Sequence, residues 1–431
     1  MKKLLITICT VITIIITCII LNIMQIETMN VTILSAKDNI LLVQDENNIQ
    51  YEFKYNTSNI LPHSKSEIKY NKLNNKIIDF KVTFKYPDIP NDWLDDGIFS
   101  KYYNLAFNKV KELSLEEKVG QLFLVRYDEK NDINNLKKYK FGGYVFYKKD
   151  FDNKTKEEVQ NMINNLQKNT SIPLLTSVDE EGGTVVRIST NRNLYPYTFK
   201  SPSELYNLNK FESIKEDTIN KSILLNELGI NLNLAPVVDV STNKNDYMYK
   251  RSIGLSTELT EEYAKTVIET SKNYPVSYTL KHFPGYGNNI DTHVGTSLDT
   301  RTYEDILKND IPPFKTGIES GAEAVLISHN IVTSIDNNNP ASLSKDVINI
   351  LKNDLNFTGI IITDDLDMGA TNKIKDASIK ALLAGNTLLI TTNYENVTRV
   401  INAVENNIIE EELINKLAFK ILAWKYYKGL L

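Results

Sequence analysis

The chain has 431 residues, of which 42% are hydrophobic and 24% charged, the composition of a folded globular protein rather than a disordered or fibrous one. Its 49 lysines and arginines nearly balance 54 acidic residues, and the formal net charge of −5 gives no general basic surface for nucleic acid. The two cysteines, Cys9 and Cys18, lie near the N-terminus, which excludes a disulfide framework and a cysteine-based metal site in the remaining chain.

The N-terminal segment, residues 1–30, has the features of a membrane-directed sequence. Lys2 and Lys3 precede an uncharged, mostly apolar run at 4–24, which at about 1.5 Å per residue can cross the roughly 30 Å hydrocarbon core of a bilayer. Residues 23–26 offer no small-residue cleavage site, so an uncleaved anchor is favoured over the alternative, a cleaved signal peptide. With the lysines inside, the rest of the chain faces outward, and we expect an exported protein that is either membrane-anchored or secreted.

Residues 31–90 predict a small β-rich module. Apolar and polar residues alternate at 49–55 and again at 78–86, which is the period of a strand with one polar face. Pro87 and Pro90 then predict a stiff linker to the next domain. Nothing in this module suggests chemistry, so we expect a spacer or a unit that contacts the cell wall.

From residue 91 to 431 the pattern changes to alternating strands and helices. Ser114 and Glu117 have the spacing of a capping box at the start of a helix. Short apolar runs follow at 143–147, 173–178, 232–238, 276–280, 324–327, 359–362 and 386–391, and helical stretches at 154–168, 258–272, 344–355 and 374–383. About eight such units predict a parallel (β/α)₈ TIM-like barrel. A doubly wound sheet is the alternative, but no GxGxxG or GxxxxGK[ST] loop follows any of these strands.

Polar residues accumulate just after the predicted strands, where a barrel places its active site. They are Asp179-Glu-Glu-Gly-Gly with Arg187, Asp239 with Arg251, Lys281-His282 followed by Asp291-Thr-His293, Ser328-His329-Asn330, and Thr363-Asp364-Asp365. A metal hydrolase is one interpretation, because histidine and aspartate at strand ends ligate zinc in many barrels. It is disfavoured because HxH and HExxH spacings are absent and a lysine and two arginines would repel a dication. We therefore predict neither a metal nor a cofactor.

These segments resemble glycoside hydrolase family 3, and within it the NagZ-type β-N-acetylglucosaminidases. The resemblance rests on Lys281-His-Phe-Pro-Gly, Asp291-Thr-His293, Asp179-Glu-Glu-Gly-Gly and Thr363-Asp364-Asp365-Leu-Asp-Met, and it covers about residues 100–430. It implies a (β/α)₈-like barrel, in agreement with the strand count. It also implies an exo-acting, retaining β-N-acetylhexosaminidase that removes terminal β-GlcNAc from cell-wall glycans of the peptidoglycan type.

The resemblance further implies roles for single residues. Asp364 matches the catalytic nucleophile, His293 the general acid/base, and Asp291 the partner of that histidine. Five residues match positions that bind the non-reducing GlcNAc: Asp179, Arg187, Arg251, Lys281 and His282. A retaining glycosidase needs a carboxylate on one face of the anomeric carbon and a proton donor at the leaving oxygen, and a histidine titrating near neutral pH can supply that proton.

Three departures from the family pattern lie between Lys281 and His293. Tyr286 stands where the family usually has histidine, Asn288-Asn289 replaces a more usual Asp-Thr or small-residue pair, and the stretch is one residue shorter. All three concern the segment that carries the acid/base pair. A neutral base in that position would also let phosphate compete with water as the acceptor.

Two other functions stay open as alternatives. One is a family 3 β-glucosidase, although those enzymes generally carry their acid/base glutamate on a further C-terminal domain. The other is an inactive family 3-like barrel that acts as an extracellular glycan-binding or signalling protein. The expected partners are a GlcNAc-containing glycan, the membrane through the N-terminal helix, and the cell wall through the β module, with no nucleic acid.

Overall fold

The computed structural model describes residues 25–37, 39–57, 60, 64–84, 89–130, 132–287, 289 and 297–431. The predicted membrane segment at 4–24 lies outside these residues, and no helix within them is long and apolar enough to cross a bilayer. The chain divides between Asn104 and Leu105 into two compact units.

The first unit is a five-stranded antiparallel sheet with the strand order β3-β2-β1-β4-β5. Its strands are β1 (Ile26–Lys37), β2 (Ile40–Asp45), β3 (Gln50–Lys54), β4 (Lys65–Asn71) and β5 (Lys76–Phe84). β1 begins inside the segment 1–30 because Ile26 pairs with the distant Asn71 of β4.

The sheet buries one face, as the alternating pattern requires. Its core consists of Val31, Ile33, Leu41, Val43, Phe53, Ile68, Tyr70 and Ile77. The turn between β2 and β3 is closed by Asp45, whose Oδ1 accepts from the backbone N–H groups of Asn47 and Ile49, each at 2.9 Å. Because aspartate can replace a backbone acceptor in this way, the register of the hairpin is fixed locally.

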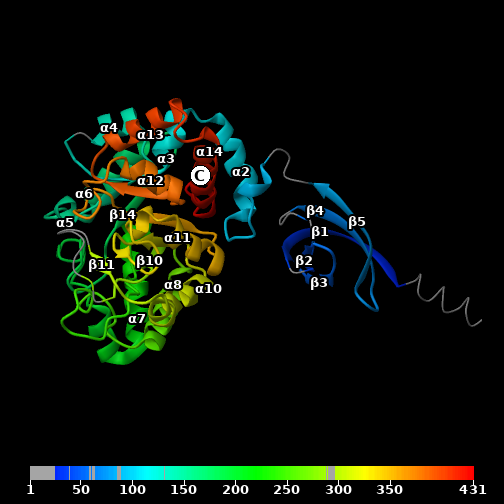
Figure 1. The fold of residues 1–431 in the computed structure, drawn as a ribbon, viewed down its shortest axis with the longest axis horizontal. Coiled ribbons are helices and arrows are strands. Elements are labelled where there is room, and N and C mark those ends of the chain that lie inside the picture. The colour runs from blue at the N-terminus through cyan, green and yellow to red at the C-terminus, as the bar shows by residue number, and fades with distance from the viewer. Residues whose placement is uncertain are drawn as a thin grey trace, which may run out of the picture. The chain divides into compact units, whose positions relative to one another are not determined.

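The second unit contains a closed barrel of eight parallel strands, which confirms the predicted barrel (Figure 1). In chain order the strands are β6 (Phe123–Arg126), β7 (Gly143–Phe146), β8 (Leu175–Val178), β9 (Leu232–Asn233), β10 (Ser277–Phe283), β12 (Ala324–Ile327), β14 (Ile360–Asp365) and β15 (Leu388–Thr391). Each neighbours the next, and β15 pairs with β6 to close the ring. Most of these strands are buried along their whole length, as expected for strands covered on both faces.

Helices surround the barrel in Figure 1. They are α2 (Tyr103–Glu112), α3 (Leu115–Gln121), α4 (Asp132–Tyr139), α5 (Lys148–Phe151), α6 (Lys156–Lys168), α7 (Pro202–Glu227), α8 (Thr257–Ser271), α9 (Tyr303–Asn309), α10 (Ile311–Glu319), α11 (Lys345–Asn349), α12 (Ala377–Ala384), α13 (Glu395–Glu405) and α14 (Glu411–Tyr427). Short helical turns occupy Asn91–Trp93, Ser100–Tyr102, Ala341–Leu343 and Ile350–Asp354, and a small parallel pair joins β11 (Leu298–Asp299) to β13 (Ile331–Val332).

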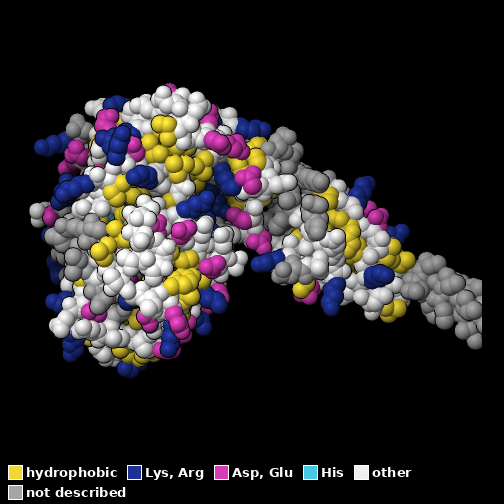
Figure 2. All heavy atoms as spheres, in the orientation of Figure 1, with side chains coloured by type: hydrophobic (Ala, Val, Ile, Leu, Met, Phe, Trp, Pro, Cys, Tyr) yellow, Lys and Arg dark blue, Asp and Glu magenta, His cyan; other side chains and the backbone are white. Residues whose placement is uncertain are grey.

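The helix starts follow from their capping residues. The predicted capping box is confirmed: Glu117 N–H donates to Ser114 Oγ at 3.3 Å, and Ser114 N–H donates to Glu117 Oε2 at 3.0 Å. The same serine or threonine with glutamate pairing starts α6 and α7. On the face shown in Figure 2, basic and acidic side chains of the barrel unit are interspersed, in keeping with the near balance of charges in the sequence.

Candidate active site

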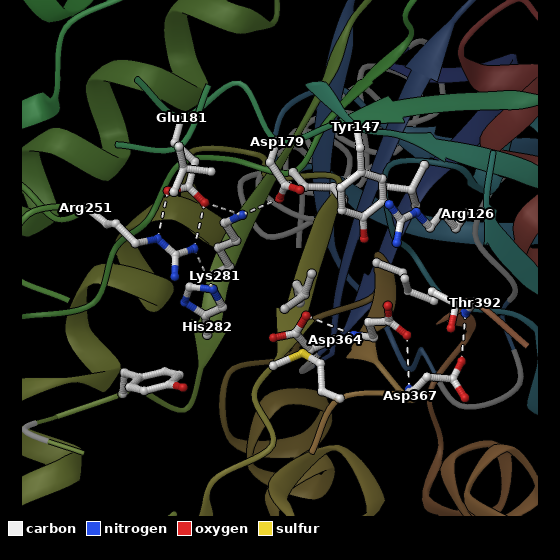
Figure 3. Close-up of a pocket in the computed structure, with 18 of the residues that line it drawn as sticks. Arg126, Tyr147, Asp179, Glu181, Arg251, Lys281, His282, Asp364, Asp367 and Thr392 are labelled. Carbon is white, nitrogen blue, oxygen red and sulfur yellow. Dashed lines mark hydrogen bonds and ion pairs between the residues drawn. The ribbon is translucent and has the colours of Figure 1, made fainter. Parts of the chain in front are cut away.

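A cavity of about 580 Å³ lies where the barrel strands end (Figure 3). Six of the predicted site residues line it: Asp179, Arg187, Arg251, Lys281, His282 and Asp364. The other two, Asp291 and His293, lie outside the described residues. The parallel barrel explains the convergence, because the carboxyl ends of all its strands meet at one face.

Glu181 is the centre of the charged network on one side of the cavity. Its Oε1 lies 2.6 Å from Lys281 Nζ, and Arg251 donates to both of its oxygens at 2.9 and 2.7 Å. Lys281 also donates to Asp179 Oδ1 at 2.8 Å. The second oxygen of Asp179 lies 3.6 Å from the guanidinium of Arg187. Two carboxylates therefore hold three cationic side chains in fixed directions around the cavity.

The charges in this network support one another. Burial alone would raise the pKa of the Glu181 carboxyl, but Arg251 and Lys281 outweigh it and hold that pKa well below its usual range. Burial would likewise lower the pKa of Lys281, but Asp179 and Glu181 raise it above its usual value. Both groups therefore stay charged around neutral pH, so the cavity presents fixed cationic donors and anionic acceptors to polar ligand groups.

His282 is held in one orientation by Asp239, a buried residue in the segment after β9. The Asp239 carboxylate lies 2.7 Å from His282 Nδ1 and also accepts from the backbone N–H of Tyr286 at 2.7 Å. On the other side of the ring, His282 Nε2 lies 3.3 Å from Arg251. Because a guanidinium can only donate, Nε2 is the acceptor and Nδ1 carries the proton toward Asp239.

Tyr286, the residue that stands where a histidine is expected from the family pattern, packs next to His282. Its ring is buried against Val237 and Met248, with its centre 5.6 Å from that of His282 and 5.8 Å from that of Tyr247. The substitution thus places an aromatic wall next to His282.

Asp364 lies at the end of β14 and faces the cavity. Its Oδ1 accepts from the backbone N–H of Asp365 at 2.9 Å. Burial would raise the pKa of Asp364, but the neighbouring His329 and His282 rings, that backbone N–H and Lys281 together hold it below its usual value. An ionised, inward-facing carboxylate is the form that a nucleophile requires.

His329 holds the end of β14, the strand that carries Asp364, through a contact with its backbone. His329 Nε2 lies 2.9 Å from the backbone oxygen of Asp365, and its Nδ1 lies 2.7 Å from Ser342 Oγ. Since a carbonyl oxygen only accepts, Nε2 carries the proton and Ser342 donates to Nδ1. His329 is completely buried, and in the described structure it acts on Asp364 by holding the backbone of the next residue, Asp365, rather than by lining the cavity.

Two further acids of this segment differ in their surroundings. Asp367 Oδ2 accepts from Thr391 Oγ1 at 2.6 Å and from the N–H groups of Thr392 and Asn393 at 2.7 and 3.0 Å, so it ties the ends of β14 and β15 together. Burial raises the pKa of Asp365 to about 6. Both acids line the cavity beside Asp364.

Several cavity residues were not singled out from the sequence. Glu181 lines the cavity as part of the acidic motif, and Asp239, which follows a predicted strand, lies against His282 without lining the cavity; the sequence assigns neither residue a role in the site. Arg126 at the end of β6 and Tyr147 directly after β7 also line the cavity. Their positions at strand ends are the signal that could have found them. Among the described residues, no group of three or more His, Cys, Asp or Glu side chains is arranged to hold a metal ion.

Comparison with known proteins agrees with this architecture. The family described as the glycosyl hydrolase family 3 N-terminal domain matches residues 114–423. A β-hexosaminidase of Haemophilus influenzae is 30% identical over 271 residues, which cover 62% of this chain and 76% of that relative. A β-hexosaminidase of Nitrosomonas eutropha is 29% identical over 259 residues, 58% of this chain and 74% of that relative.

A solved structure gives the same result. The structure of a glycoside hydrolase family 3 β-N-acetylglucosaminidase from Paenibacillus sp. str. FPU-7 has a TM-score of 0.69 and 26% sequence identity to this chain. The match covers 74% of this chain and 63% of that chain, so the present protein spans less than two thirds of that neighbour. The extent of the family match over the barrel shows that the chain belongs to glycosyl hydrolase family 3.

Proposed function

We propose that the protein removes terminal β-linked GlcNAc from glycans with net retention at the anomeric carbon. The single observation that carries this proposal is the position of the Asp364 carboxylate, which faces a cavity whose other side holds the Glu181, Lys281 and Arg251 network (Figure 3). A carboxylate opposite an array of fixed donors and acceptors suits a sugar, whose hydroxyl groups need both kinds of partner. The β-hexosaminidase names of the relatives support the choice of sugar.

The reaction would proceed in two displacements. Asp364 attacks the anomeric carbon and forms an ester, while the bond to the leaving oxygen breaks and that oxygen takes a proton. Water then attacks the same carbon from the face that the leaving group occupied, the ester bond breaks, and Asp364 is restored. We assign the proton transfers to His293, oriented by Asp291, on the family resemblance of their sequence motif.

The binding roles follow from the network. Asp179, Arg187, Arg251, Lys281 and His282 would bind the hydroxyl groups of the non-reducing GlcNAc. Glu181 and Asp239 would act as positioning residues, because Glu181 orients Lys281 and Arg251 and Asp239 orients His282. A sugar held by charged donors in fixed directions keeps its anomeric carbon near Asp364, which is the main gain from positioning.

We also propose that the part of the predicted segment 1–30 that precedes β1 directs export, as an anchor or as a cleaved signal, and that the protein acts outside the membrane on cell-wall glycans. The apolar run at 4–24 behind two lysines supports this. In the same proposal the module at 31–90 contacts the wall, and 91–431 forms the catalytic domain. Cell fractionation tests it: the protein should appear in the membrane or the medium, and confinement to the cytoplasm would contradict it.

The enzymatic proposal is tested with 4-nitrophenyl β-GlcNAc and 4-nitrophenyl β-glucoside. We expect hydrolysis of the GlcNAc substrate only, with the β anomer as the first product by NMR. Asp364→Asn should lower kcat by about 10³-fold or more, because the amide cannot act as the nucleophile. The matched control is Asp346→Asn at an exposed position of α11, which should leave kcat unchanged.

The remaining outcomes decide between the alternatives. His293→Ala should lose less activity on this activated leaving group than on a natural glycan. Selective hydrolysis of the glucoside would favour a β-glucosidase. Binding of GlcNAc without turnover of either substrate would favour an inactive glycan-binding barrel and overturn the proposal.

A further inference from the structure

Arg301 joins two other parts of the chain through one guanidinium group. It follows β11, and 24% of its side chain is exposed. Its Nε and Nη2 donate to Asp299 in β11 at 3.0 and 2.7 Å, and its Nη1 donates to Asp310 Oδ2 at 2.7 Å. Asp310 directly precedes α10, and both carboxylate groups are buried. Because hydrogen bonds between ionised partners are the strong ones, this guanidinium holds β11 against the start of α10.

The same cluster packs against two glycines that follow β10. A Cβ atom at Gly285 would overlap the Asp310 carboxylate, and one at Gly287 would lie 2.5 Å from Arg301 Cζ. Both glycines have a positive φ, 120° and 59°, which glycine adopts without steric cost. Because neither position carries a side chain, the backbone after β10 lies directly against Arg301 and Asp310.

The chain returns to the same guanidinium at β11. Backbone N–H groups in and directly after β13 donate to carbonyl oxygens in and directly before β11, each at 2.9 Å, so the returning backbone is fixed. Gly287 and Asp299 therefore contact Arg301 from the two ends of the sequence between them. That sequence includes Asp291 and His293, the proposed acid/base pair.

The surroundings of Asp310 suit a positioning role better than a stabilising one. Among the described residues its second oxygen, Oδ1, is buried with no hydrogen-bond partner, and burial raises the pKa of this carboxyl to about 7 although Arg301 opposes the rise. A buried ion pair gives little net stability, because the cost of removing both charges from water offsets their attraction. The pair does provide a defined geometry, since a guanidinium binds carboxylates in fixed directions.

We infer that Arg301 is a positioning residue for the acid/base step and acts on Asp291 and His293 through the two ends of the sequence that carries them. The inference rests on the proposed function and deepens it, because it adds a residue outside the cavity to one step of the reaction. Arg301 does not line the cavity, and in this account it neither touches the sugar nor transfers a proton. A catalytic group misplaced by about 1 Å lowers a rate by about 10²-fold, which sets the scale of the expected effect.

The experiment uses two substrates with the same sugar and different leaving groups. Protonation of the leaving oxygen matters more for phenyl β-GlcNAc than for 4-nitrophenyl β-GlcNAc, because 4-nitrophenolate is the more stable anion. The readout is the ratio of kcat/KM for the nitrophenyl substrate over the phenyl substrate. Arg301→Gln should raise this ratio by about 10-fold or more, through a larger loss on the phenyl substrate. Arg301→Lys keeps the charge without the planar fork and should raise the ratio less.

Inhibition by free GlcNAc separates positioning from a general loss of structure. The Arg301 cluster shares no residue with the Glu181 network, so the inhibition constant of Arg301→Gln should stay within about 2-fold of wild type. The matched control Arg399→Gln, at an exposed position on α13, should leave both the ratio and the inhibition unchanged. If Arg301→Gln does not fold, Asp310→Asn, which still offers Arg301 an acceptor, replaces it in every comparison with a smaller expected rise in the ratio.

A double-mutant cycle with His293→Ala tests whether Arg301 acts through the acid/base. If it does, Arg301→Gln should change the ratio no further in the His293→Ala background. Equal losses on both substrates, a wild-type ratio in the single variant, or additive effects in the double variant would overturn the inference. Inactivity of the wild-type protein on both substrates would overturn the proposed function itself, whereas wild-type turnover with any of those three results would overturn the inference alone.

Discussion

Replacing Glu181 by glutamine removes one negative charge from the centre of the buried network. The side chain is 2% exposed and is in contact with Lys281 at 2.6 Å and Arg251 at 2.7 and 2.9 Å. In Glu181→Gln the amide oxygen can still accept a hydrogen bond, and Lys281 keeps Asp179 as a partner. Arg251, however, loses its carboxylate and retains His282 at 3.3 Å.

The size of the expected loss of unfolding free energy in Glu181→Gln follows from the partners that Lys281 and Arg251 retain. Removing one member of a buried ion pair typically costs about 3–5 kcal/mol, because the other charge stays buried without compensation. The new amide side chain would still offer one acceptor oxygen, and Lys281 would still contact the Asp179 carboxylate. We therefore expect a loss at the lower end of this range, about 3 kcal/mol of unfolding free energy at pH 7. The same change should reduce kcat/KM by at least about 10-fold, because Arg251 and Lys281 lose their common orienting group.

The loss of stability should depend on pH in a defined direction. The pKa of Glu181 is lower in the folded than in the unfolded chain, so its stabilisation is complete above the unfolded value of about 4.3 and is lost as the pH falls toward the folded value. The difference between wild type and Glu181→Gln should therefore be constant from pH 7 to about 5 and narrow below about pH 4.3.

Urea unfolding followed by the helical circular dichroism signal measures this difference, because the long helices belong to the barrel unit. The control is Glu216→Gln at an exposed position of α7, which should change the unfolding free energy by less than about 0.5 kcal/mol. If Glu181→Gln also changes the unfolding free energy by less than about 0.5 kcal/mol, the carboxylate does not hold the network together and the account is refuted.

Three further changes test other parts of the structure. Asp239→Asn should lower kcat/KM by about 10- to 100-fold, because the amide orients His282 less well; unchanged kinetics would contradict this. Gly143→Ala should destabilise the barrel by about 1–3 kcal/mol in urea unfolding, since the added Cβ would lie 2.2 Å from the backbone oxygen of Leu175, and an unchanged midpoint would contradict it. Burial lowers the pKa of Lys425 to about 7, so above pH 7 the unfolded chain holds a proton at this residue that the folded chain has lost. The contribution of Lys425 to the free energy of unfolding should therefore rise by about 1.4 kcal/mol per pH unit, and this rise should be missing in Lys425→Met. Equal slopes of unfolding free energy against pH in the two proteins from pH 7 to 9 would contradict this.

The strand-end argument placed most of the cavity correctly in space. Asp179, Lys281 and Asp364 are far apart in the chain, yet each follows an apolar run, and a parallel barrel brings such positions to one face. Some helices were predictable from the local pattern of apolar and polar residues. The expected helix at 258–272, for example, is α8, Thr257–Ser271. The expected helix at 344–355 divides instead into α11 and a wider turn at Ile350–Asp354, which local periodicity does not reveal.

The partners inside the cavity could not be predicted in this way. Glu180 and Glu181 are adjacent acids in one motif, and only the fold separates their tasks. Glu180 accepts from the backbone N–H groups of Arg187, Ile188 and Ser189, whereas Glu181 turns to Arg251 and Lys281. Which acid meets which cation depends on the path of the loop after β8, and that path is set by long-range packing.

The most direct test of the central claim asks whether Asp364 forms the bond to the sugar. Asp364→Ala is assayed on an activated aryl β-GlcNAc substrate with and without sodium azide. If Asp364 is the nucleophile, the variant is inactive alone, azide restores aryl release, and the product is the α-configured glycosyl azide, because azide takes the place and the face of the missing carboxylate. Wild-type rates in Asp364→Ala without azide, or a β-configured azide product, would contradict the account.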